Sequence, residues 1–278
     1  MPRLIIVGCG FLGETAADFF YAAGWDVLGL CASAESAGRL AAKPFEVRAL
    51  DITRDFTADA PWRGVDALVH CASSGRGGEE AYRAVYLDGL LNVITAFQPR
   101  RTLFTGSTSV YAQMDGSLVD ETSETRPDRA TGKILLDAEG VALACGGYVA
   151  RLSGIYGPGR SVLRRKFLAG EAVIEGDGGR WINQIHRDDA ARAILHLFTS
   201  RAASGIYNVS DDTPAPQKEV YGWLADHFHQ PLPPTGELDP NRKRGWTSKR
   251  VNNAKLRGMG WCPNFPSYRE ALSAPGAI

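Results

Sequence analysis

The chain has 278 residues, of which 44% are hydrophobic and 22% are charged, a composition typical of a globular protein with a large buried core. Its 31 basic and 31 acidic residues balance, which argues against binding to nucleic acid or to a membrane surface, because both need an electropositive field. We expect a cytoplasmic protein without a metal site, because the five cysteines form no C-x-x-C pair and the sequence shows neither a signal peptide nor a long apolar span.

Strands and helices are predicted to alternate from residue 4 to residue 152. Short apolar runs predict strands over 4–7, 26–30, 45–50, 67–71, 102–106 and 147–152. Longer segments between them predict helices over 11–23, 35–42, 79–97 and 131–144, the first of them stopped by Gly24. This alternation predicts an α/β protein with a doubly wound parallel sheet, the Rossmann fold.

The second half of the chain is less regular. Residues 113–129 are polar and predict a loop, a turn is predicted at Gly157-Pro158-Gly159, and helices are predicted over 161–169 and 188–199. We assign residues 1–155 to a dinucleotide-binding core. Residues 156–278 are expected to complete that core and to form a small substrate-side lobe.

A glycine-rich turn follows the first predicted strand and opens the first predicted helix. In a G-x-G-x-x-G turn the first glycine makes the tight bend, the second lets the backbone approach a pyrophosphate, and the third lets helix and strand pack closely. Free N–H groups at the helix N-terminus then hold the anion. The motif predicts a dinucleotide site, and the alternative is a purely structural turn. The expected cofactor-binding residues are Gly8, Gly10, Phe11, Leu12 and Gly13.

The end of the second predicted strand bears on the choice between NAD and NADP. NAD sites usually carry an acidic residue there, but residues 30–34 contain none before Glu35. Without a carboxylate to repel a 2′-phosphate, Ser33 and Arg39 could hold one. The sequence therefore slightly favours NADP over NAD, although Arg39 is equally well explained as a solvated helix residue.

Six later segments, at residues 50–52, 68–73, 106–111, 151–159, 185–190 and 207–209, occur in a characteristic order and spacing. Together they resemble the extended short-chain dehydrogenase/reductases, the NAD-dependent epimerase/dehydratase family, over nearly the whole chain. The resemblance implies that Asp51 and Ile52 contact the adenine, and that Ser107 hydrogen-bonds the reacting carbonyl or hydroxyl of a small-molecule substrate. It also implies contacts to the ribose and nicotinamide from Cys71, Ala72 and Ser73. The alternatives are a turn cap for Asp51 and a strand-end hydroxyl for Ser107.

The chemistry of this family needs a tyrosine and, four residues later, a lysine whose ammonium lowers the pKa of the phenol. In the register that keeps Pro127, Gly132 and Glu139 in their family positions, Thr131 stands at the tyrosine and Leu135 at the lysine. Both groups that would exchange a proton are then missing.

A second register keeps Lys133 as the lysine and puts Arg129 at the tyrosine. Arginine does not lose its proton at working pH, so this register also lacks the acid and base. The proton must then come from elsewhere, and Tyr111 is the nearest phenol in the sequence. The candidate catalytic residues are Ser107, Tyr111, Thr131 and Lys133.

Two functional hypotheses remain open at this point. The first is an oxidoreductase-like or epimerase-like enzyme that binds NAD(P) and a small polar substrate, and the second is a non-catalytic NAD(P)-binding sensor or partner-binding protein. The family often carries an arginine that grips a substrate phosphate four residues before His186, but Ile182 stands there, which puts a nucleotide-sugar substrate in doubt. His186 itself is better explained as a core histidine than as a functional residue. A homodimer is compatible with the resemblance.

Overall fold

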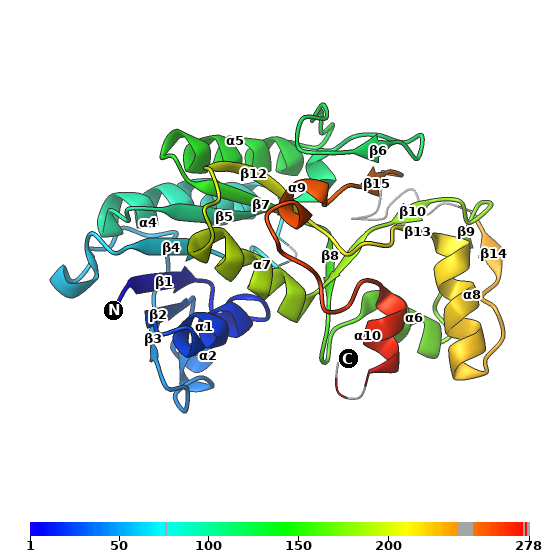
Figure 1. Cartoon of the computed structure of the whole chain (residues 1–278), viewed down its shortest axis with the longest axis horizontal. Coiled ribbons are helices and arrows are strands. Elements are labelled where there is room, and N and C mark those ends of the chain that lie inside the picture. The colour runs from blue at the N-terminus through cyan, green and yellow to red at the C-terminus, as the bar shows by residue number, and fades with distance from the viewer. Residues whose placement is uncertain (76, 238–246, 275, 277–278) are drawn as a thin grey trace.

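The computed structural model describes residues 1–75, 77–237, 247–274 and 276. Its centre is a seven-stranded sheet with the order β12-β7-β5-β4-β1-β2-β3, in which every neighbouring pair is parallel (Figure 1). The strands are β1 (Arg3–Val7), β2 (Asp26–Cys31), β3 (Glu46–Ala49), β4 (Ala67–His70), β5 (Thr102–Ser107), β7 (Tyr148–Leu152) and β12 (Gly205–Val209). The predicted doubly wound Rossmann fold is confirmed.

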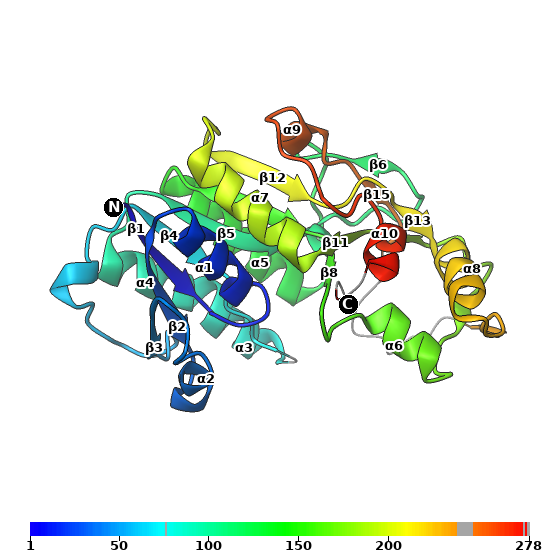
Figure 2. The ribbon, with the colours of Figure 1, turned by 60° about the horizontal axis from the view of Figure 1, so that its bottom comes forward.

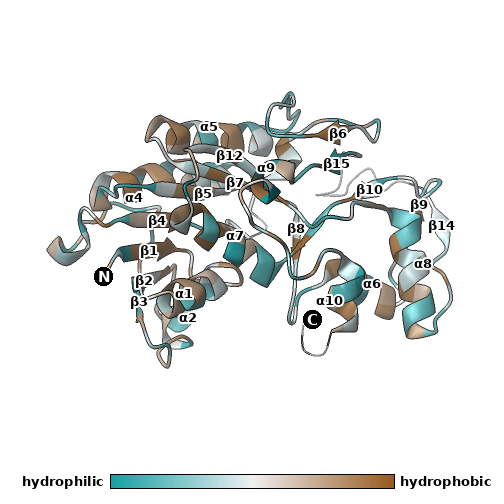
Figure 3. Ribbon diagram, in the orientation of Figure 1, coloured by the Kyte–Doolittle hydropathy of each residue, from teal (hydrophilic) through white to brown (hydrophobic). Residues whose placement is uncertain are grey.

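Helices cover both faces of the sheet, which explains why its strands are continuous apolar runs. Helices α1 (Gly13–Ala22) and α7 (Arg187–Thr199) pack on one face, and α4 (Gly89–Phe97) and α5 (Ala130–Ala144) on the other (Figure 2). Alternate residues of β1 serve the two faces: Leu4 joins the core under α1 and α7, whereas Ile5 joins the core under α4 and α5. Figure 3 shows this concentration of hydrophobic residues on the central strands.

The structure refines the boundaries of several predicted elements. The predicted helix over 79–97 is divided into α3 (Glu79–Tyr82), the π-helix η2 (Arg83–Asp88) and α4. The helix predicted over 35–42 is the shorter α2 (Ala34–Gly38), and the predicted loop over 113–129 contains β6 (Leu118–Val119). Single π-turns inside helices are frequently found at functional sites, so η2 is relevant below.

The substrate-side lobe is built from short elements around a core of its own. Its helices are α6 (Val162–Leu168), α8 (Gln217–Phe228) and α10 (Tyr268–Ser273), whereas α9 (Ala254–Arg257) contacts β12 and buries Leu256 in the core under α1 and α7. Its strands are β8 (Gly154–Tyr156), β9 (Ile174–Glu175), β10 (Trp181–Ile182), β11 (Gln184–His186), β13 (Ala215–Pro216), β14 (Thr235–Gly236) and β15 (Arg250–Val251). They pair as the two-stranded sheets β8–β11, β9–β14, β10–β13 and β6–β15. Residues after 156 also supply β12 and α7 to the main sheet and its cover.

A buried carboxylate connects the two parts of the molecule. Asp189, in the first turn of α7, is fully buried and accepts hydrogen bonds from the backbone N–H groups of Asn264 (2.8 Å) and Phe265 (2.9 Å). It also pairs with Arg192. The C-terminal segment that leads to α10 is thereby fixed to the helix that covers the main sheet.

Candidate dinucleotide site

The three glycines of the turn after β1 meet three different surroundings. Gly8 has φ +86°, and a Cβ there would stand 2.4 Å from the Ala72 Cα atom, so only glycine fits against the end of β4. A Cβ at Gly13 would stand 2.3 Å from the Gly8 carbonyl oxygen. A Cβ at Gly10 would meet nothing within 4 Å in the described part of the chain. Packing therefore requires glycine at positions 8 and 13, whereas Gly10 borders open space.

The free space at Gly10 lies at the N-terminus of α1. The Gly8 and Cys9 N–H groups both bond to the Leu30 carbonyl, and the Gly10 N–H bonds to the Gly8 carbonyl. Among the described residues no side chain caps α1. The Glu14 N–H bonds to the Gly10 carbonyl (2.8 Å), and the turn just before it, at Phe11 and Leu12, is where a ligand can meet backbone N–H groups. Phe11 and Leu12 lie in this segment. The turn has the geometry and the partial positive charge that hold a phosphate group.

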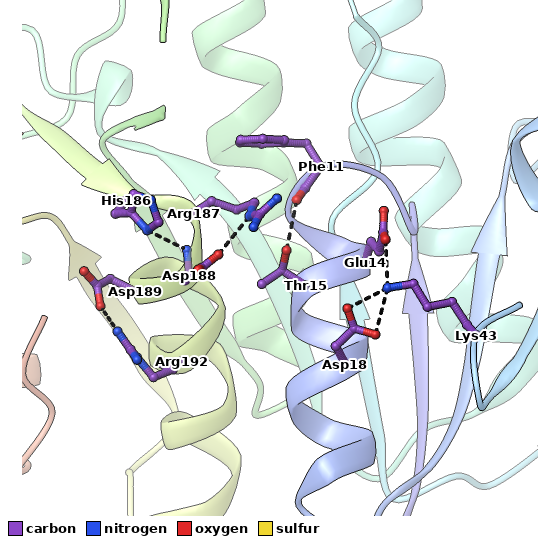
Figure 4. Close-up of polar contacts among 10 residues, drawn as sticks. All are labelled: Phe11, Glu14, Thr15, Asp18, Lys43, His186, Arg187, Asp188, Asp189 and Arg192. Carbon is purple, nitrogen blue, oxygen red and sulfur yellow. Dashed lines mark hydrogen bonds and ion pairs between the residues drawn. The ribbon is translucent and has the colours of Figure 1, made fainter. Parts of the chain in front are cut away.

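Two acidic residues of α1 lie close to this anion site, and a lysine neutralises them (Figure 4). Lys43 Nζ lies 2.8 Å from Glu14 Oε1 and 2.7 Å from Asp18 Oδ2. These contacts raise the pKa of Lys43 although partial burial opposes them. The carboxylates are therefore balanced by a cation and do not leave an uncompensated negative charge beside the turn.

Hydroxyl groups and a guanidinium gather at the end of β2. Ser33 Oγ accepts a hydrogen bond from the Ser36 N–H (3.2 Å) and also lies 3.2 Å from Ser36 Oγ. The Arg39 guanidinium donates to Ser36 Oγ (3.1 Å). The structure thus brings the predicted Ser33 and Arg39 together and adds Ser36, which sequence reasoning missed although it lies three residues after Ser33.

The predicted adenine and ribose contacts lie at the ends of β3 and β4. Asp51 Oδ1 accepts from the Thr53 hydroxyl (2.6 Å) and from its N–H (3.0 Å), and these bonds lower the pKa of Asp51. Ile52 is buried against α4, close to Gly89. Asp51 therefore caps its own turn, the alternative role considered from the sequence, while its half-exposed carboxylate stays at this edge of the sheet.

The end of β4 contributes a thiol, a small side chain and a hydroxyl. Burial raises the pKa of Cys71 to about 12, so its thiol is neutral. Ala72 lies directly against Gly8 of the phosphate-binding turn. Ser73 Oγ accepts hydrogen bonds from the Gly75 N–H (3.3 Å) and from the Tyr86 hydroxyl (3.3 Å). Of these three side chains, Ser73 is the one with a hydroxyl, and it forms hydrogen bonds to other segments of this edge.

Tyr86 is a phenol at this edge that sequence reasoning missed. It belongs to the π-helix η2, and its ring lies edge-on to Phe104 of β5, with a centroid distance of 6.3 Å. The helix η2 packs against α5, which carries Thr131. No sequence signal pointed to Tyr86, because its approach to Ser73 depends on the turn of the π-helix.

Ser107 ends β5, as predicted, and Thr131 and Leu135 lie on α5. Ser107 Oγ accepts from the Ser109 N–H (3.2 Å), so the strand-end role and a role toward a ligand are both open to it. Thr131 is half-buried, and Leu135 is buried in the core between α5 and the sheet. Lys133 is exposed, in a shallow hollow with Pro127 and neighbouring residues. Lys133 therefore points away from the face of α5 that Leu135 occupies.

Tyr111, the predicted proton-exchanging phenol, lies in a buried polar network. Its side chain is fully buried, and its hydroxyl donates to Asn208 Oδ1 (2.9 Å). The Arg151 guanidinium lies 4.9 Å from the ring centre and forms a buried ion pair with Glu139 (2.7 Å). Burial raises the pKa of Tyr111 despite the nearby arginine. Tyr111 is therefore enclosed in a buried polar network and is poorly placed to exchange a proton with a substrate.

Two histidines near the sheet are also structural. His186 is buried, and its Nδ1 accepts from the Asp188 N–H (3.2 Å), which caps α7. His70 is buried beneath η2 with Nε2 3.1 Å from the Val85 carbonyl oxygen, and burial lowers its pKa to about 4. Among the described residues no group of three potential metal ligands occurs, and no helix there is long and apolar enough to cross a membrane.

A buried lysine on the substrate side was also missed. Lys249 is 4% exposed, and its ammonium donates to Thr247 Oγ1 (2.5 Å). Its carbonyl accepts from the Asn183 side chain (2.8 Å), next to Ile182, where the family often has an arginine. Burial lowers the pKa of Lys249 to about 8. The sequence carried no signal for this placement, because residues 183 and 249 are brought together only by the fold.

Comparisons with known proteins agree with this geometry. A model of the NAD dependent epimerase/dehydratase family matches residues 4–210. Protein YeeZ from Escherichia coli strain K12 is 30% identical over 219 residues, which are 75% of this chain and 77% of YeeZ. A structure assigned to an NAD-dependent epimerase/dehydratase from Methylobacillus flagellatus is 28% identical, with a TM-score of 0.79 over 97% of this chain and 95% of that one.

A more distant structure shares the fold. DesIV from Streptomyces venezuelae, a dTDP-glucose 4,6-dehydratase solved with NAD and TYD bound, is 20% identical. The match covers 98% of this chain and 95% of the DesIV chain, with a TM-score of 0.77. At this level of identity the likeness establishes the architecture alone.

Proposed function

Because the chain belongs to the NAD-dependent epimerase/dehydratase family, we propose that it is an NAD(P)-binding enzyme of the oxidoreductase or epimerase type that acts on a small polar substrate. The observation that carries the proposal is the open space at Gly10, at the uncapped N-terminus of α1. A bound nicotinamide dinucleotide would supply hydride transfer. The chain would hold its pyrophosphate at the turn after β1.

The pocket for the reacting group is proposed at the carboxyl ends of β4 and β5, where ligands bind in open parallel sheets. Ser107, at the end of β5, would hydrogen-bond a substrate carbonyl or hydroxyl. Thr131 lies on the first turn of α5, in the register that puts it at the family's tyrosine. Contacts in the structure support this register, because a Cβ at Gly132 would stand 2.4 Å from the Pro127 side chain and Glu139 pairs with Arg151.

In this register the enzyme needs another proton-exchanging group, and Tyr86 is the phenol best placed to supply it. Its hydroxyl contacts Ser73 at the end of β4, the position that the family resemblance links to the ribose and nicotinamide. Losing a positioned acid or base typically lowers a rate by about 10²–10⁴-fold. Tyr86→Phe should therefore suppress turnover and leave cofactor affinity unchanged, whereas Tyr21→Phe, a control at an exposed phenol on α1, should leave both unchanged.

The chain is proposed to accept NADP(H) at least as well as NAD(H). The Ser33, Ser36 and Arg39 groups at the end of β2 offer hydroxyl and guanidinium donors, and within the described ranges none of them is paired with a carboxylate. Phosphate groups are well matched to such donors. This finer choice of cofactor rests on these three residues alone.

A non-catalytic dinucleotide-binding protein is the second candidate. It is favoured by Thr131 and Leu135, which stand at the family's tyrosine and lysine positions and cannot exchange a proton, and by the burial of Tyr111, the phenol considered as a substitute. The two candidates separate in a screen of small carbonyl and hydroxy compounds with reduced and oxidised cofactor. Cofactor-dependent turnover that Tyr86→Phe suppresses supports the enzyme. Tight cofactor binding without turnover of any compound supports the second candidate.

A further inference from the structure

Two arginines from beyond residue 156 lie beside the phosphate-binding turn. The guanidinium carbon of Arg160 is 4.9 Å from the centre of the Phe11 ring, and that of Arg187 is 5.2 Å from it. Phe11 directly follows Gly10, and Figure 4 shows the Arg187 side chain extending toward it. The N-terminus of α1 therefore gathers two full positive charges in addition to its own partial charge.

The fold holds these arginines in place from two separate elements. Arg160 closes the turn after β8, in which Gly157 and Arg160 exchange two backbone hydrogen bonds of 2.9 Å. Arg187 is the first residue of α7. A Cβ at Gly157 would stand 3.1 Å from Arg187 Cβ and 3.5 Å from Phe11 Cζ, so the turn packs closely against both. The turn after β8 thus packs against the Phe11 ring of the phosphate-binding turn.

The positive charge of this cluster is only partly balanced. Arg187 Nε donates to Asp188 Oδ1 (2.9 Å). In the described part of the chain the Arg160 guanidinium has no carboxylate partner, and its ring contact with Phe11 leaves its N–H donors available. Glu14, the nearest acidic residue of α1, is engaged by Lys43. The cluster therefore has the charge and the donors for a dianion.

We propose that Arg160 and Arg187 form a guanidinium clamp that closes on the cofactor's pyrophosphate from the substrate side. This inference rests on the proposed function and adds two binding residues to it. Guanidinium groups hold phosphate oxygens through paired, charge-assisted hydrogen bonds, and Phe11 orients them by cation–π contact. Because Arg160 belongs to the turn that leads into α6, cofactor binding should also stabilise that turn against local opening.

Calorimetric titration with NADH and NADPH tests the clamp in the full-length protein. Arg160→Met and Arg187→Met should each weaken both cofactors about tenfold, and Arg160→Lys should retain part of the affinity because it keeps the charge but not the paired donors. Arg165→Met is the control, since Arg165 lies on α6, is largely exposed and pairs with Glu171. Circular dichroism checks that each variant is folded.

Hydrogen exchange supplies a second readout that a purely structural role would not change. Addition of NADPH to the wild-type protein should slow exchange over residues 157–168, and this protection should be lost in Arg160→Met. Unchanged cofactor affinity in the Arg160→Met/Arg187→Met double variant would overturn the clamp and leave the proposed function intact. If the wild-type protein binds neither cofactor, the proposed function fails and the clamp fails with it.

Discussion

The phosphate-binding edge and the substrate-side lobe are stabilised in different ways. At the edge, β1, the turn and α1 are consecutive in the chain, and the close contacts that make glycine necessary involve Gly8, Gly13 and the adjacent strand β4. In the lobe, short strands pair across long stretches of sequence, as β9 does with β14 and β6 with β15. The edge is a rigid local unit, whereas the lobe depends on contacts that only the complete fold supplies.

Because of this difference, the effects of a substitution on binding and on folding can be separated at the edge more easily than in the lobe. At the edge, one glycine can be changed for its effect on binding and another for its effect on folding, because each has its own surroundings. In the lobe, a single buried group such as Asp189 supports several segments at once, so its loss should loosen a whole region.

The largest effect is expected at Gly13. A valine there would place its Cβ 2.3 Å from the Gly8 carbonyl oxygen, which neither the turn nor β1 can move to accommodate. We expect Gly13→Val to lower the free energy of unfolding by more than about 3 kcal/mol. Urea denaturation measures this loss, with Gly10→Val as the matched control that should unfold like the wild type. Equal stability of the Gly13 and Gly10 variants would remove the distinction drawn between these glycines.

A somewhat smaller loss is expected when the lobe is released from α7. Asp189→Ala leaves the Asn264 and Phe265 N–H groups and Arg192 without their buried acceptor, which should cost about 2–3 kcal/mol. Limited proteolysis should cut the C-terminal segment before the main sheet opens. Asp188→Ala, at the preceding position, is the control. A variant that unfolds only as a whole, without earlier cleavage, would show that the lobe is not a separate cooperative region.

Acid should affect the two regions in opposite directions. Burial lowers the pKa of His70 from 6.5 to about 4, so the unfolded chain takes up the proton first and stability is lost as pH falls below 6.5. Burial raises the pKa of Asp211 in the lobe well above its usual value, so the folded state holds the proton and stability is lost as pH rises. The main sheet is thus weakened by acid, and the lobe is strengthened.

Variants separate these two contributions. Between pH 7 and pH 5, His70→Phe should lose about 2 kcal/mol less unfolding free energy than the wild type. Asp211→Asn should lose more unfolding free energy than the wild type between pH 7 and pH 5. The variant lacks the buried carboxyl group, whose protonation stabilises the folded wild type as the pH falls. Denaturation at both pH values measures the differences. If the wild type and both variants showed the same change in unfolding free energy between pH 7 and pH 5, the pKa shifts of His70 and Asp211 would be contradicted.

The smallest effect is expected in the choice of cofactor. Arg39→Ser removes the guanidinium beside Ser36, so the affinity for NADPH should fall about tenfold, or about 1.4 kcal/mol, while the affinity for NADH is unchanged. Arg54→Ser is the control, since Arg54 is exposed and pairs with Asp51 at the neighbouring strand end. A wild-type preference of tenfold or more for NADH would contradict this prediction and would point to Glu35 as the ribose-binding acid.

The sequence predicted the edge well because its chemistry is local. The glycine spacing and the apolar run before it define the strand, turn and helix. Ser33 and Arg39 both contact Ser36 because they flank one short helix. The surroundings of Tyr111 could not be predicted in this way, since only the fold shows that its hydroxyl meets Asn208, 97 residues later in the chain. Tyr86, Arg160 and Lys249 were missed for the same reason. Their neighbours come from distant segments, and α8 and the short paired strands carry too weak a pattern to predict.

The most direct test of the account is calorimetric titration of the wild-type protein and Gly10→Val with NADPH and NADH. The account predicts that the wild type binds both, NADPH at least as tightly as NADH. It also predicts that Gly10→Val stays folded and loses binding, because its side chain fills the space where the pyrophosphate would lie. Equal affinity of the two proteins for the cofactors would show that the dinucleotide does not use this turn, and would contradict the central claim.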